Sequence, residues 1–293
     1  MRRFILCVIC CCFVLGSLCV VDKAEAGPWS PKLGKGYAKL WFRWLPSNNY
    51  AKGDFSRVPF HGYHEWNVVT YGEVGLSRGL ALFWQSDLTR IYLLPEKGGK
   101  REGPFVGVGD PALGLKWQFL QRGPLALGVS GSVRAPLADS SPKGKIYSSE
   151  EGAPLLGELR MGMGAWAFQG AFSWGLGFRR WYLQGELGFE VRTAGQDPAF
   201  RWSVSSGVNL VWGISTSLRL SGHHAIPVGV EPRHDGPSGL GHGTSYTGMA
   251  FIIDWEFVDN WYLGTTIELS ILFQGVARQA GGPVTTLYVA TKF

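Results

Sequence analysis

The chain lacks cysteine beyond its first 26 residues, because all five cysteines lie between Cys7 and Cys19. The remaining residues can therefore form no disulfide framework, no thiolate metal site and no cysteine nucleophile. Cysteines inside an apolar leader are explained as small apolar side chains.

Long hydrophobic runs and clusters of like charge are missing after Gly27. No window there holds enough consecutive apolar residues for a membrane-spanning helix. The net charge of the whole chain is +6, and it becomes +5 when three basic and two acidic residues of the first 26 are subtracted. These charges are spread along the chain, so we predict no nucleic-acid partner.

The first 26 residues have the features of an export signal. Two arginines precede an apolar run from Phe4 to Val21, and Ala24 and Ala26 form the small-x-small site that a signal peptidase needs. We therefore predict a cleaved signal peptide over residues 1–26 and a second region, residues 27–293, that is exported.

Two alternatives for the leader stay open. The apolar run of about 18 residues could just span a bilayer as an anchor, although no basic stop-transfer flank follows it. A lipoprotein signal centred on Cys19 is disfavoured by Leu18, which stands where that peptidase needs a small residue.

Glycine and aromatic residues are abundant. The chain has 42 Gly, 13 Trp and 17 Phe, with a mean hydropathy of +0.03. Aromatic residues spaced along the whole length are typical of a transmembrane barrel with two interfacial belts, and a water-soluble core does not need them.

Polar and apolar residues alternate with a period of two in many segments, which predicts strands. The segments are 37–44, 66–76, 80–88, 110–119, 125–134, 183–192, 201–210, 214–220, 251–257 and 267–271. A soluble sandwich also alternates, but here the polar face carries enough full charges for a water-filled lumen.

The connections between these segments alternate between short and long. The short ones are 77–79, 121–123, 178–180, 212–213 and 258–260, and the long ones are 46–63, 92–106, 137–153, 193–200, 225–245 and 274–283. Short periplasmic turns and long outer loops are typical of outer-membrane barrels. Eleven connections predict an all-β fold, a transmembrane antiparallel β-barrel of about 12 strands.

One stretch, Leu155–Phe178, is too long for one ordinary crossing and contains five glycines. A hairpin hidden inside it would raise the number of strands to fourteen. We keep twelve and expect one strand that protrudes beyond the bilayer.

The chain ends on an aromatic residue, Phe293, whose strand face also carries Thr291, Val289 and Leu287. This ending resembles the recognition strand that the barrel-assembly machinery of Gram-negative bacteria binds. An edge strand of a soluble protein is the alternative, which the leader disfavours. We expect residues 285–293 to pair with residues 37–44 and to close the barrel.

The expected inward faces are balanced in charge. The inward cations are Lys39, Arg43, Lys116, Arg134, Arg160, Arg192, Arg201, Arg219 and Lys292, and the inward anions are Glu73, Asp87, Asp110, Glu158, Glu186, Glu190, Asp254, Glu256 and Glu268. Such residues either neutralise one another or line a path with weak charge preference.

Candidate catalytic residues gather in one long loop. His223, His224, His234, Ser238 and His242 lie in or beside it, and a hydrolase would need a histidine within reach of a nucleophile. A glycine- and proline-rich loop does not hold such a geometry, so we predict no enzyme, no cofactor and no metal site.

Residues 107–117, with the sequence GVGDPALGLKW, resemble the GxGD…LGLKY segment of outer-membrane transporters associated with the meta pathway of phenol degradation. Residues 183–192 are similar to a later strand of that family. The resemblance implies a barrel that passes small aromatic or apolar compounds, and it assigns no binding residue. Gly107 and Gly109 are interpreted as strand glycines that make space, because no helix follows to form a phosphate loop.

We therefore predict a porin-like channel or transporter for small molecules in the outer membrane, with lipid, the assembly machinery and a small solute as partners. A non-transporting surface or adhesion barrel is the alternative. An outer-membrane hydrolase is the third hypothesis.

Overall fold

A computed structural model describes residues 27–51, 57–94, 103–147, 155–226, 235–236, 245–274 and 279–293. The predicted signal peptide and its cleavage site at Ala24 and Ala26 lie outside these residues. No helix in the described ranges is long and apolar enough to cross a membrane.

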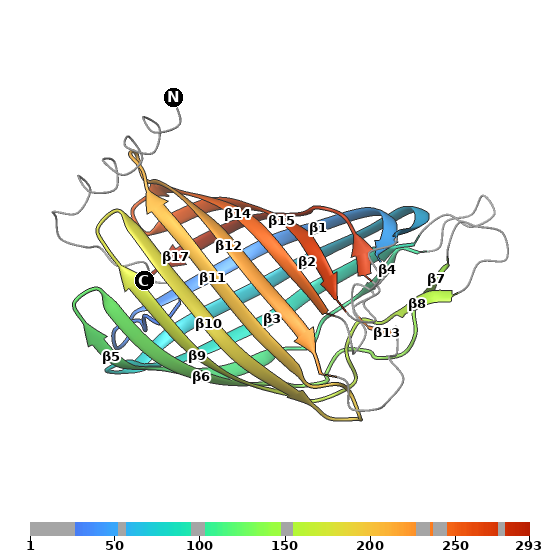
Figure 1. Ribbon diagram of the computed structural model, residues 1–293, viewed down its shortest axis with the longest axis horizontal. Helices are drawn as coiled ribbons and strands as arrows, with labels where there is room; N and C mark the ends of the chain where they lie inside the picture. Colours follow the sequence, from blue (N-terminus) through green and yellow to red (C-terminus); the bar gives the residue numbers. More distant parts are fainter. Residues whose placement is uncertain are drawn as a thin grey trace.

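Twelve antiparallel strands form a closed barrel (Figure 1), which confirms the predicted fold class and strand number. They are β1 (Gly36–Ala51), β2 (Arg57–Ser77), β3 (Leu80–Leu93), β5 (Ala112–Arg122), β6 (Leu125–Arg134), β9 (Ala167–Gly177), β10 (Trp181–Arg192), β11 (Ala199–Asn209), β12 (Ile214–Ala225), β14 (Ser245–Val258), β15 (Trp261–Gln274) and β17 (Val284–Lys292). Each strand pairs with the next one along the wall, so no edge of the wall is left unpaired.

The first and last strands close the wall, as the sequence analysis predicted. Tyr37 lies opposite Lys292, and the pairing continues to Trp44 opposite Thr285. Beyond the last ladder pair, the Phe293 amide donates to the Gly36 carbonyl at 3.1 Å, and the Gly36 amide donates to the Phe293 carbonyl at 2.9 Å. The terminal strand is therefore hydrogen-bonded along its whole length.

All five short turns lie where the sequence predicts them, at one end of the barrel. At the β11–β12 turn, both Trp212 and Gly213 have positive φ, 59° and 73°. Two such residues in succession are typical of a type I′ turn, whose twist matches that of a hairpin. Trp212 is 85% exposed there, where an aromatic side chain can lie at the membrane surface.

The long connections differ in part from the prediction. β1 and β2 continue as a paired hairpin to Ala51 opposite Arg57, so strand covers most of the expected loop 46–63. Membrane-spanning strands need only about 9 to 11 residues, whereas β2 has 21. This hairpin therefore extends beyond the bilayer, because backbone hydrogen bonds continue to stabilise it in water.

The expectation for Leu155–Phe178 was wrong in its detail. The stretch is not one protruding strand: β8 (Leu155–Leu159) leaves the wall, a turn follows, and β9 begins at Ala167. β8 pairs with β7 (Gly144–Tyr147) and with β13 (Asp235–Gly236) in a separate three-stranded sheet at the loop end of Figure 1. Two short pieces, β4 (Phe105–Gly107) and β16 (Gln279–Gly281), extend the main sheet beside β3 and β1.

The outer face of the wall is apolar. Large side chains on alternate positions of the strands are a third to a half exposed, as shown by Leu40, Phe42 and Trp44 on β1 and by Trp255 and Phe257 on β14. Their polar neighbours along each strand face inward. This arrangement fits a lipid-facing band around a polar lumen.

Candidate functional site

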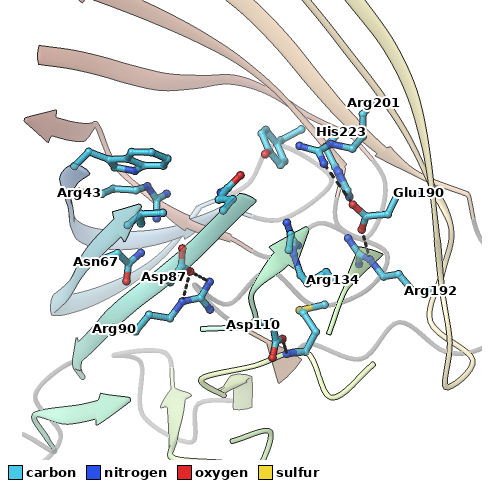
Figure 2. A pocket seen from close by; sticks show the side chains of 16 residues that line it. Arg43, Asn67, Asp87, Arg90, Asp110, Arg134, Glu190, Arg192, Arg201 and His223 are labelled. Atoms are coloured by element: carbon cyan, nitrogen blue, oxygen red, sulfur yellow. Dashed lines mark hydrogen bonds and ion pairs between the residues drawn. The ribbon is translucent and has the colours of Figure 1, made fainter. Parts of the chain in front are cut away.

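The lumen holds a cavity of about 310 Å³ in the half that lies toward the long loops (Figure 2). Five arginines from five strands line it: Arg43 on β1, Arg90 on β3, Arg134 on β6, Arg192 on β10 and Arg201 on β11. Three acidic residues share the lining: Asp87, Asp110 and Glu190. A lining with more cations than anions attracts negatively charged solutes.

Arg90 faces the cavity because of a bulge in β3. The register against β2 slips by one residue between Asp87 and Thr89, which leaves Leu88 without a partner. A bulge reverses the alternation of faces beyond it, so Arg90 lies on the same side as Asp87 and donates to it at 2.7 Å through Nε. Alternation counted from Asp87 places this arginine outside, so the sequence analysis missed it.

The β1–β3 side of the cavity is electrically matched. Arg43 lies 3.0 Å from Glu65, whose side chain also accepts hydrogen bonds from Tyr63 and Asn67. Arg90 contacts Asp87 and donates to the Met161 carbonyl at 2.9 Å. Each guanidinium on this side therefore has its own carboxylate.

The β6–β11 side has one carboxylate for three guanidiniums. Glu190 contacts Arg192 through one oxygen and lies 3.4 Å from Arg201 through the other. Arg201 also donates to Gln169 at 2.9 Å. The Arg134 side chain has no hydrogen bond or ion pair to any residue that the structure describes, and Figure 2 shows it pointing into the cavity.

Three ring-bearing residues that the sequence analysis did not name as lumen candidates also line the cavity: Trp41, His223 and Tyr246. His223 and Tyr246 lie opposite one another on β12 and β14, with rings stacked at 5.9 Å. Inward aromatic residues escape an analysis that searches only the polar face for charge.

An apolar cover lies over the outer side of the cavity. Leu159, the last residue of β8, and Met161, two residues further on, are buried in one cluster with Tyr63 and Tyr92 of the wall. Asp110 holds the same cover by accepting from the backbone amides of Ala138 at 2.9 Å and Met163 at 2.7 Å. The cover is thus fastened by both apolar packing and charge-assisted hydrogen bonds.

Residues 27–35 cross the lumen at the opposite, short-turn end. Residues 33–35 pair with Gly75 on β2. Further along, Trp29 is 5% exposed and lies over Gly175 and Gly177 of β9. A Cβ at Gly175 would lie 2.6 Å from the Trp29 ring, so the absence of a side chain makes room for this residue.

Polar groups of the wall hold the same segment. The Ser30 amide donates to Gln118 at 3.0 Å, and the Lys116 ammonium lies 3.5 Å from the Gly27 carbonyl. Lys116 is 7% exposed and is also paired with Glu73, on β2. A buried lysine with a paired carboxylate is the arrangement that a low-polarity environment requires.

The structure distributes the predicted lumen residues over several levels. Seven line the cavity: Arg43, Asp87, Asp110, Arg134, Glu190, Arg192 and Arg201. Six others lie on inward positions nearer the short turns: Lys39, Glu73, Lys116, Glu186, Arg219 and Asp254. Arg219 pairs with Glu268 at 3.5 Å.

Four predicted lumen residues have other positions. Glu256 accepts from the Asn260 amide at 2.9 Å at the β14–β15 turn, and Lys292 lies over the Tyr262 ring close by. Glu158 and Arg160 are not on a barrel strand: Glu158 belongs to β8 and Arg160 follows it, 3.8 Å away. Placing these two on the barrel wall was wrong, because the chain leaves the wall between β6 and β9.

The candidate catalytic residues do not converge in the described ranges. His224 accepts from the Trp202 indole at 3.0 Å, and Ser245 accepts from the Ala225 amide at 3.0 Å. His234, Ser238 and His242 lie outside the described residues. Among the residues that are described, no group of three or more His, Cys, Asp or Glu is placed to hold a metal ion.

The glycines of the motif at residues 107–117 make space, as the sequence analysis expected. A Cβ at Gly107 would lie 2.7 Å from the Met161 side chain, and one at Gly109 would lie 2.6 Å from Asp87. Gly107 therefore lets Met161 of the cover approach β4 closely, and Gly109 lets the segment before β5 approach the bulged strand β3.

Solved structures share this architecture. An outer membrane channel from Pseudomonas putida F1 matches with a TM-score of 0.63 at 11% identity, over 94% of this chain and 100% of that one. The NanC porin matches with a TM-score of 0.54 at 8% identity, over 87% of this chain and 100% of that one. The fold is that of an outer-membrane barrel. Both of these proteins are named for channel or porin function and neither as an enzyme. No protein-family model and no curated protein matches the sequence.

Proposed function

We propose that this protein is an outer-membrane channel through which one class of small molecule passes without an energy source. The observation that supports this proposal is the charged cavity inside the closed barrel, between the outer cover and residues 27–35. A lumen that served only to stabilise the barrel would not need three guanidiniums around a single carboxylate.

The cavity lining also bears on the kind of solute. The resemblance at residues 107–117 implies aromatic or apolar compounds, whereas the lining is rich in arginine. An apolar solute would have to displace water from these guanidiniums without replacing its hydrogen bonds, which is unfavourable. We therefore propose a polar solute, with Trp41 and Tyr246 in contact with any aromatic part.

Passage of a solute requires two segments to move: the cover at the loop end and residues 27–35 at the short-turn end. The predicted lumen residues Lys39, Glu73, Glu186, Arg219 and Asp254 would line the path below the cavity once residues 27–35 shift. The cover, which is packed around Met161 and Leu159, would limit entry from the outside. Gating by segments that fold into the lumen needs no change in the wall itself.

Planar-bilayer recording of purified, refolded protein tests the channel proposal. We expect discrete openings of small conductance, which heat-denatured protein should not produce. Heat-modifiable migration in gel electrophoresis shows independently that the barrel is folded. A folded barrel that never opens, at any voltage or salt concentration, would contradict the proposal.

One observation favours a second candidate, a surface or adhesion barrel without transport. The β7–β8–β13 sheet extends beyond the barrel at the loop end, where it is placed to meet an external partner. Absence of conductance, together with unchanged surface binding after the cavity arginines are replaced, would support this candidate over the channel.

A further inference from the structure

We propose that the cavity is a binding site for a small organic carboxylate, with Arg134 as its main contact. This inference deepens the proposed channel function and rests on it for the route by which the anion arrives. The site is built on the β6–β11 side of the cavity, where guanidiniums outnumber carboxylates.

The register of the wall places two of these arginines on either side of a single alanine. Ala167, the first residue of β9, lies opposite Arg134 of β6 on one side and opposite Arg192 of β10 on the other. Ala167 is buried and has the smallest side chain that could separate them. The two arginine side chains, both labelled in Figure 2, therefore have no large wall side chain between them.

The resident carboxylate contacts two of the three arginines. One oxygen of Glu190 contacts Arg192, and the other lies 3.4 Å from Arg201. The N–H donors of the Arg134 side chain are therefore available to a solute. On the opposite side of the cavity, Arg43 and Arg90 each have a carboxylate partner. A carboxylate on a solute matches the planar fork of a free guanidinium through two parallel hydrogen bonds.

The dimensions and the other walls limit the solute to a small molecule. Ligand sites have volumes of roughly 300 to 1,000 Å³, and this cavity, at about 310 Å³, lies at the lower end. Across from Arg134, the stacked rings of His223 and Tyr246 offer a flat surface. A single-ring or short-chain carboxylate fits these limits, whereas a chain of several sugars does not.

The test measures binding of benzoate to folded, detergent-solubilised protein by isothermal titration calorimetry, with benzamide as the uncharged analogue. We expect saturable binding of benzoate, and binding of benzamide weaker by about tenfold or more, because the amide forms no charge-assisted pair. The Arg134→Gln variant should lose the same factor. Arg122→Gln is the matched control, because Arg122 is an exposed arginine at the end of β5 that does not line the cavity, and it should bind benzoate as the unaltered protein does.

A second variant tests the site without removing an arginine. Ala167→Glu adds a carboxylate between Arg134 and Arg192 and should abolish benzoate binding while the barrel remains heat-modifiable. Equal binding of benzoate and benzamide, or unchanged benzoate binding in both Arg134→Gln and Ala167→Glu, would overturn the proposed site. Bilayer recording separates this failure from that of the channel: conductance without benzoate binding rejects the site alone, and benzoate binding without conductance rejects the channel alone.

Discussion

The two ends of the lumen are both occupied by chain segments, but these are held in different ways. At the loop end, the cover is attached to the wall on both sides and packs Leu159 and Met161 into an apolar cluster. At the short-turn end, residues 27–35 are continuous with the wall on one side only, through β1, and are held by Trp29 and a few polar contacts. Fewer buried apolar contacts mean a lower free energy of local opening, so the short-turn end is the easier one to open.

This difference indicates a division of roles along the path. In the proposed channel, the cover would limit what enters, because it forms one boundary of the arginine-lined cavity. Residues 27–35 would form a more weakly held obstruction on the far side. The predictions below test this contrast, beginning with the largest expected effect.

Removal of Phe293 should have the largest effect, because it should prevent the barrel from assembling, so that neither end of the lumen forms. Phe293 is about half exposed on the outer face, where Leu287 is also exposed, and we propose that the assembly machinery binds this face. We expect most of the protein to be lost from the outer membrane, as measured by fractionation and heat-modifiability. Phe257→Ala removes another outward aromatic residue near the same end and should assemble normally. Equal assembly of the two variants would contradict the role of Phe293.

Deletion of residues 28–32 should open the short-turn end of the lumen while the cover at the loop end stays in place. The deletion removes the Trp29 ring and the Ser30 contact with Gln118, so we expect single-channel conductance to rise several-fold. Trp29→Ala should give a smaller rise, whereas Trp261→Ala, an outward tryptophan near the same turns, should give none. An unchanged conductance in the deletion variant would show that these residues do not obstruct the path.

Asp110→Asn should loosen the other end, but less. Asparagine has one acceptor oxygen in place of two, so one of the amides of Ala138 and Met163 loses its partner. Loss of a hydrogen bond to a charged group costs about 2 kcal/mol, while the apolar cluster around Met161 remains. We expect more frequent brief openings at unchanged maximal conductance in bilayer recordings. A several-fold rise in conductance would instead show that the cover is the weaker closure.

Acidification from pH 7 to about pH 5 should have the smallest effect on the cover. Asp139, in the loop that leads to β7, has a pKa held below its usual range by hydrogen bonds from Lys143 and Ser141. A lowered pKa means that these contacts persist above the ordinary aspartate pKa of about 4 and weaken only as the pH falls toward the lowered value. Conductance should therefore be constant across this range, and Asp139→Asn should not change its pH profile.

Much of the fold was predictable because its signals are local. Alternation placed the strands, and the five short turns fixed their parity, so the pairing of residues 285–293 with residues 37–44 at the closing seam could be predicted. The path of the chain through β8, outside the wall, could not be predicted. The glycines of residues 155–178 permit a turn, but they do not indicate where the chain leaves the wall.

The cavity was only partly predictable. Residues such as Arg43, Arg134 and Glu190 face the lumen by simple alternation, and the sequence analysis named them. Arg90 was missed because the bulge at Leu88 changes which face its side chain occupies. A bulge depends on the partner strand as well as on its own residues, and alternation along one strand carries no information about it.

The sequence by itself determined the class of fold, the number of strands and the closing pair, because side chains at alternate positions must face either lipid or lumen. Only the tertiary structure decided which charges meet. The predicted lumen was balanced, yet the register brings Arg134, Arg192 and Arg201 around the single carboxylate Glu190. The reason is geometric: total charge is a sum over residues, whereas an unmatched guanidinium depends on which strands are neighbours and at what height their side chains lie.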